Sequence, residues 1–141
     1  MRLLALAFVT VILGQPLGPY SGDWTAEFHG TTYVRLALND KAGTLQGAIS
    51  IGKSIQVDGK GNVDRVTEAG STLIPVTDVR RSGNVLSFSY QKDGQDFSTF
   101  ELRFIDTNTA ELTVLLPEEE RQQLAVEGIP LPKPFRLAKS R

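Results

Sequence analysis

From Gly22 onward, apolar residues fall at every second position, which restricts the chain to strands that bury one face. In the first run Trp24, Ala26 and Phe28 share one face, and more polar side chains occupy the other. Later runs keep this spacing, and turn-forming residues separate them. The predicted inner face consists of Trp24, Phe28, Leu36, Leu38, Ile49, Ile51, Phe88, Tyr90, Phe100, Leu102, Phe104, Leu112, Val114 and Phe135.

The runs are short and follow one another closely, so successive strands are expected to pair as hairpins. About eight or nine strands fit the chain, with turns over 39–43, 82–84, 92–94 and 106–108. Such a sheet must cover its edges or close, and the scarcity of long crossovers favours closure. We therefore predict an all-β fold, an antiparallel up-and-down meander closed as a barrel of about 8–9 strands, with a β-sandwich as the alternative.

One segment near the C-terminus departs from the alternation. Pro117 suits the first turn of a helix, glutamates follow it where the helix dipole favours carboxylates, and Gly128 suits the end. We predict a short helix from about Pro117 to Val126 before the last strand. The proline-rich stretch over 129–134 is expected to be extended, and 135–139 to form that last strand.

The first residues have the pattern of an export signal. A positively charged start precedes an uncharged run over 3–13, which is too short to span a bilayer and is broken by 14–16. We expect a signal peptide and short linker over 1–21, one β-barrel domain over 22–141, and a mature protein in the periplasm or outside the cell. No A-x-A triplet marks the cleavage site, so an uncleaved anchor is the alternative; cleavage would leave no stable membrane span.

Composition argues against several classes of function. The 141 residues include no cysteine and one histidine, so disulfides and metal sites built on thiolates or paired imidazoles are excluded. A net charge of -1 argues against a nucleic-acid partner. His29 is expected at the surface, and 57–64 as a polar hairpin turn, because Lys60 stands where a calcium loop needs an oxygen ligand. We expect neither a metal nor a cofactor.

The triplet Gly22-Asp23-Trp24 at the head of the first strand resembles the G-x-W motif that opens lipocalins. A meander with a helix before its last strand is also similar to the layout of that family. The resemblance implies a barrel in which Trp24 closes one end beneath a basic side chain. Pairing of the first and last strands sets Lys139 opposite Trp24, where an ammonium over an indole contributes about 0.5–2 kcal/mol. The chain also resembles small exported β-domains of environmental bacteria without an assigned activity.

A small barrel either fills its interior with side chains or holds one small molecule there. We take the apolar inner face to favour the second case, a binding protein. The hydroxyl of Tyr90 is the expected polar handle. The alternative is a structural or protein-interaction module of the bacterial envelope that needs no ligand and acts through a sheet edge or 129–134. The predicted lining of a pocket for a small apolar molecule is Trp24, Phe28, Leu36, Ile49, Phe88, Tyr90, Phe100 and Phe104.

An enzyme is the third hypothesis, since barrels of this shape can hold an apolar substrate for a cyclase or isomerase. A catalytic barrel should place a titratable group in its cavity, and Tyr90 alone takes the inner parity. Glu27, Tyr33 and Arg35 fall on the predicted outer face, where cross-strand charge pairing accounts for them. The sequence therefore assigns no catalytic residue.

Overall fold

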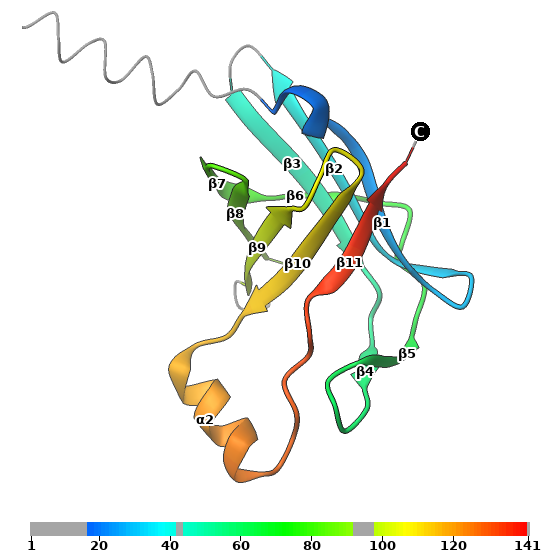
Figure 1. The fold of residues 1–141 in the computed structure, drawn as a ribbon, viewed down its shortest axis with the longest axis vertical. Helices are drawn as coiled ribbons and strands as arrows, with labels where there is room; N and C mark the ends of the chain where they lie inside the picture. The colour runs from blue at the N-terminus through cyan, green and yellow to red at the C-terminus, as the bar shows by residue number, and fades with distance from the viewer. Residues whose placement is uncertain (1–16, 42–43, 92–97, 141) are drawn as a thin grey trace, which may run out of the picture.

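The computed structural model describes residues 17–41, 44–91 and 98–140, which form an antiparallel, nearly closed β-barrel (Figure 1). The first sixteen residues of the expected signal peptide and linker (1–21) and the expected turn at 92–94 lie outside these ranges. In chain order the elements are the 3-10 helix η1 (Gly18–Tyr20), β1 (Gly22–Phe28), β2 (Thr31–Lys41), β3 (Thr44–Ile51), β4 (Ile55–Val57), β5 (Val63–Val66), β6 (Ile74–Pro75), β7 (Thr77–Ser82), β8 (Val85–Tyr90), β9 (Ser98–Phe104), β10 (Thr109–Leu115), the helix α2 (Glu118–Val126) and β11 (Phe135–Lys139).

Nine strands form the barrel wall in the order β6-β3-β2-β1-β11-β10-β9-β8-β7. The first and last strands, β1 and β11, lie side by side at the centre of this order. Its two ends, β6 and β7, are parts of one stretch of chain separated by Val76 alone. That stretch pairs with β3 on one side and β8 on the other, and the Val76 N–H donates to the Gly47 carbonyl at 2.9 Å. The predicted all-β meander, with one short helix before the last strand, is confirmed.

The predicted inner face fills the interior of the barrel, because side chains alternate between the two faces of each strand. Four of the predicted inner residues are only partly buried: Phe28, Ile51, Tyr90 and Val114. Each is the last or next-to-last residue of its strand, and in the antiparallel order all four lie at the same end of the barrel. We call this end, the lower one in Figure 1, the mouth.

Two pieces of chain outside the barrel wall lie at the mouth. The hairpin of β4 and β5 forms a separate two-stranded sheet, and its residues Ile55, Val63 and Val66 pack partly buried against the core. The second piece, residues 116–134, which we call the arm, carries α2 below the barrel and returns to β11 (Figure 1). None of the residues of α2 is buried.

The placement of Tyr33 on the outer face is wrong, since the residue is 4% exposed and belongs to the core. A β-bulge explains the difference: Ala26 pairs with Val34, whereas the residue after Ala26 pairs with Thr32, which leaves Tyr33 as the extra residue. The Tyr33 ring meets Phe135 edge to face, with centroids 5.6 Å apart. Burial raises the pKa of the Tyr33 hydroxyl.

Candidate functional site

Aromatic rings of the core fill the end of the barrel opposite the mouth, which we call the plugged end. It is the upper end in Figure 1. Trp24 is 0% exposed, and its Nε1 donates a hydrogen bond to the Tyr20 carbonyl oxygen at 3.0 Å. The Tyr20 ring stacks on Phe104 with centroids 4.0 Å apart, and Leu17 belongs to the same buried core. Residues 17–21, predicted to be a linker, therefore complete this end of the barrel.

Lys139 lies opposite Trp24 in the register of β1 and β11, as the sequence predicts. In place of the predicted contact with the indole, its ammonium donates a hydrogen bond to the Pro19 carbonyl oxygen and so joins η1 to the last strand. A Cβ at Gly22, whose φ is +133°, would lie 2.9 Å from Cε of Lys139. The glycine of the G-x-W motif thus leaves room for the lysine, while its tryptophan fills the end.

The mouth contains a pocket of about 560 Å³. Its walls come from the ends of β3, β8 and β10, the starts of β4, β9 and β11, and the arm. Three lining residues carry polar groups: Lys53, Tyr90 and Ser98. The apolar side chains of the lining belong to Ile51, Ile55, Phe100, Val114, Pro132 and Phe135.

A second hollow of about 490 Å³, which we call the arm groove, lies between the end of β10 and the two legs of the arm. Three leucines of the arm and of β10 line it, together with other residues of both segments, among them Arg121 and Lys133, and with Phe135 of β11. The arm groove and the mouth pocket share Val114, Pro132 and Phe135 as lining residues. The two hollows are therefore neighbours on either side of these residues.

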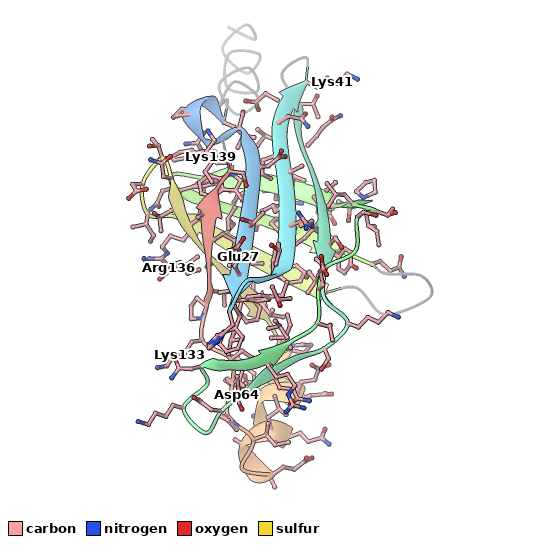
Figure 2. The ribbon with its side chains drawn as sticks, turned by 90° about the vertical axis from the view of Figure 1, so that its right-hand side faces the viewer. Glu27, Lys41, Asp64, Lys133, Arg136 and Lys139 are labelled. Carbon is pink, nitrogen blue, oxygen red and sulfur yellow. The ribbon has the colours of Figure 1, made fainter. Side chains whose placement is uncertain are left out.

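The β4–β5 hairpin and the arm meet beside the mouth through a backbone hydrogen bond, from the Lys133 N–H to the Gly61 carbonyl oxygen at 2.9 Å. Figure 2 shows Lys133 in the lower half of the molecule beside this hairpin, far from Lys139 near the other end of the barrel. Gly61 has a φ of +86°, and a Cβ on it would lie 2.5 Å from the Leu131 carbonyl oxygen. Glycine is therefore required for this close approach of the two backbones.

The turn of this hairpin is shaped by Asp58. Its Oδ1 accepts hydrogen bonds from the backbone N–H groups of Lys60 at 2.8 Å and Asn62 at 3.0 Å. These two bonds hold the pKa of the Asp58 carboxyl below its usual value, because they stabilise the charged form. The predicted polar hairpin turn is confirmed. In the described ranges no group of three or more histidine, cysteine, aspartate or glutamate side chains is placed to hold a metal ion.

Most of the predicted lining residues lie deeper than the mouth pocket. Tyr90 and Phe100 line it, and Phe28 is partly buried with its ring 4.1 Å from that of His29. His29 itself is exposed in the turn after β1, at the predicted surface position. The other five predicted lining residues are fully packed in the core: Trp24, Leu36, Ile49, Phe88 and Phe104.

Several lining residues were not assigned to the site from sequence because they belong to the hairpin and the arm. Ile55 lies on the short strand β4, Lys53 lies between β3 and β4, and Pro132 lies on the arm. Their position directly beside strand ends is the one sequence signal that connects them to the mouth. Phe135 was placed on the inner face but not in the lining, although it contributes to both hollows.

The lining of the mouth pocket is largely apolar and carries a few polar groups. Its described lining offers apolar surface, two hydroxyl groups and an ammonium group, and it includes neither a carboxylate nor an imidazole. Glu27, on the outer face, accepts a hydrogen bond from the Thr32 hydroxyl at 3.4 Å.

Comparison with protein-family models, with curated protein sequences and with solved structures finds no match for this chain. No helix in the part of the chain that the structure describes is long and apolar enough to cross a membrane. What the protein does must therefore be inferred from its own residues.

Proposed function

We propose that this chain is an exported β-barrel protein related to the lipocalins and that it binds one small apolar molecule at its mouth. The observation that carries the proposal is the pocket of about 560 Å³, lined mostly by aliphatic and aromatic side chains. Pockets for small molecules have this size and composition, with a few polar groups that orient the ligand. Tyr90 and Ser98 supply hydroxyl groups of this kind.

The contrast between burial and exposure at the two ends supports the choice of the mouth. The predicted inner residues of the plugged end are fully packed, whereas Ile51, Tyr90 and Val114 retain exposed surface at the mouth. An apolar ligand that covers this surface gains about 0.8 kcal/mol for each methylene removed from water. A ligand of about ten carbons thus gains enough to offset the entropy lost on association.

Features of the sequence and of the fold support the relationship to lipocalins, and features of the sequence support export. The G-x-W motif, the pairing of Trp24 with Lys139 and the helix before the last strand match the lipocalin layout. The uncharged run over 3–13 supports export, and the absence of cysteine suits a protein of a bacterial envelope. Export predicts a mature mass that lacks residues up to about position 14.

Binding of a neutral fluorescent naphthylamine to the purified mature protein tests the pocket. The variant Val114→Trp places a large ring in the mouth, and we expect it to weaken binding of the dye at least about tenfold. The matched control is Ile105→Trp, which adds the same ring at an exposed position beside the plugged end and should leave binding unchanged. Circular dichroism checks that both variants are folded.

Native mass spectrometry of the protein exported from a bacterial host complements this assay. We expect an added mass of a few hundred daltons that disappears on denaturation. Failure of the wild-type protein to bind any apolar probe, with no added mass after incubation with lipid extract, would contradict the proposed function. Equal dye binding by Val114→Trp and the wild type would place the site elsewhere.

A protein-interaction module is the second candidate function, and the arm favours it. Val126 is 87% exposed, and Ile129 and Leu131, which follow it on the arm, are also exposed apolar residues. Such a module would interact with an envelope protein through this surface. A photocrosslinking side chain at position 126 should then capture one envelope protein in the exporting host, and the same group at position 105 should not. Without a crosslink specific to position 126, this second function is untenable.

A further inference from the structure

The described charged side chains that line the two hollows carry one sign. Lys53 lines the mouth pocket, and Arg121 and Lys133 line the adjoining arm groove. No aspartate or glutamate is among the described residues that line either hollow. Every lining charge that the structure places here is therefore positive.

These three cations differ in what already neutralises them. The Arg121 guanidinium forms an ion pair with Glu118 at 2.6 Å. The charge of Lys133 acts on Asp58 and contributes, after the backbone hydrogen bonds, to the low pKa of that carboxyl. Lys53 forms no ion pair or side-chain hydrogen bond with any residue that the structure describes. It is the one cation among the described residues that line the mouth pocket, and none of the described residues compensates its charge.

An uncompensated ammonium at the edge of an apolar pocket favours a ligand with an anionic end. Hydrogen bonds between an ammonium and a carboxylate or phosphate are among the stronger ones, because both groups are charged. Partial exclusion of water by the bound apolar part strengthens the attraction further. The Ser98 hydroxyl, which lines the same pocket, is a second donor for such a group.

We propose, on the premise that the mouth is the binding site, that its ligand is an anionic amphiphile whose acidic group is bound by Lys53. The apolar part of the ligand lies against Phe100, Val114 and Phe135, and the anionic group remains at the edge, where Lys53 reaches water. The rings that fill the barrel beyond Phe100 limit how deep the apolar part extends. The chemistry required of the ligand is thus a short apolar tail with one carboxylate or phosphate.

Three probes with the same ten-carbon tail separate charge from apolar burial: decanoate, decanol and decyltrimethylammonium. Each is titrated against the neutral naphthylamine bound to the mature protein, at pH 7 and low salt. We expect decanoate to displace the dye at the lowest concentration and the cationic probe at the highest. Added salt should weaken the advantage of decanoate over decanol, because it screens the exposed ammonium.

The variant Lys53→Gln assigns the effect to one residue. We expect it to weaken decanoate binding about fivefold and to leave decanol binding within about twofold. Lys60→Gln is the matched control, since Lys60 lies in the turn of the β4–β5 hairpin and does not line the pocket. It removes the same charge from the protein and should leave the preference for decanoate intact.

The outcomes distinguish this inference from the proposed function. If decanol displaces the dye and decanoate is no better, the anionic ligand is ruled out while the apolar site stands. An equal loss of preference in Lys60→Gln and Lys53→Gln overturns the role of Lys53. If none of the three probes displaces the dye and the dye itself does not bind, both the inference and the proposed function fail.

Discussion

The two ends of the barrel start from the same alternating strands and finish differently. At the plugged end, η1 lies against the rings of the core. The Tyr20 ring stacks on Phe104, and the Tyr20 carbonyl oxygen accepts a hydrogen bond from the Trp24 indole. At the mouth, the β4–β5 hairpin and the arm lie beside the strand ends and leave a pocket of about 560 Å³. The strands build the wall at both ends, and the segments outside the wall decide whether an end is filled or hollow.

Under the proposed function, this difference assigns stability to the plugged end and binding to the mouth. Rings buried from all sides contribute most to the free energy of unfolding, because their removal leaves a cavity. Partly exposed residues at a pocket contribute less to the free energy of unfolding, and their water-exposed apolar surface is available to a ligand. Each of the following variants compares the two ends on this basis.

The largest effect is expected for Trp24→Ala at the plugged end. The variant removes a fully buried ring and leaves the Tyr20 carbonyl oxygen without its indole donor, which should lower the free energy of unfolding by about 3–5 kcal/mol. Val114→Ala at the mouth is the comparison, with an expected loss below about 1.5 kcal/mol. Urea unfolding at pH 7 measures both. Similar losses at the two positions would remove the distinction between the ends.

An intermediate effect is expected for Gly61→Ala at the mouth. Its Cβ would collide with the Leu131 carbonyl oxygen, so the hairpin and the arm must separate and the hydrogen bond from the Lys133 N–H must lengthen or break. Hydrogen exchange at the Lys133 amide should become at least about tenfold faster, with a loss of stability of about 1–2 kcal/mol.

Gly59→Ala is the matched control for this contact, because it lies in the same turn and a Cβ there meets no atom within 4 Å. It should leave exchange at the Lys133 amide unchanged. The Trp24 indole N–H at the plugged end should remain protected in both variants. Unchanged exchange at Lys133 in Gly61→Ala would show that the hairpin and the arm are not coupled through this contact.

The smallest effect concerns pH and Tyr33, whose pKa is raised in the folded protein by burial. A raised folded pKa means that the folded state binds the hydroxyl proton more tightly than the unfolded chain does. The resulting stability is fully present below the unfolded pKa of about 10 and is lost as the pH rises through the folded pKa. Denaturant unfolding between about pH 8 and 12 should therefore show a steeper decline for the wild type than for Tyr33→Phe. Parallel declines would contradict the burial of the hydroxyl.

Much of the barrel could be predicted from the sequence, because the alternation of apolar and polar residues along a strand indicates which face of the sheet each side chain occupies. It predicted the inner set that includes Trp24, Phe88 and Phe104, and the pairing of Trp24 with Lys139 followed from antiparallel order. The helix boundaries followed from Pro117, the glutamates and Gly128, which act locally.

The site was harder to predict because alternation says nothing about depth along the barrel axis. Trp24 and Phe100 share the inner parity, yet one fills the plugged end and the other lines the mouth pocket. The position of Tyr33 was predicted wrongly because one extra residue in a β-bulge reverses which of the following side chains face inward. Lys53 and Ile55 were not assigned to the site because they lie beside or on β4, a strand too short to show a clear alternation of apolar and polar residues.

The single tryptophan provides the most direct test, since its indole N–H gives one isolated signal from the plugged end. We would titrate the isotope-labelled mature protein with decanoate and follow the amide and indole signals by NMR. Binding at the mouth predicts that the shifts concentrate on residues such as Gly52, Lys53 and Ser98, while the Trp24 indole signal stays in place. A shift of the Trp24 indole N–H with an unchanged mouth would contradict the assignment of binding to the mouth.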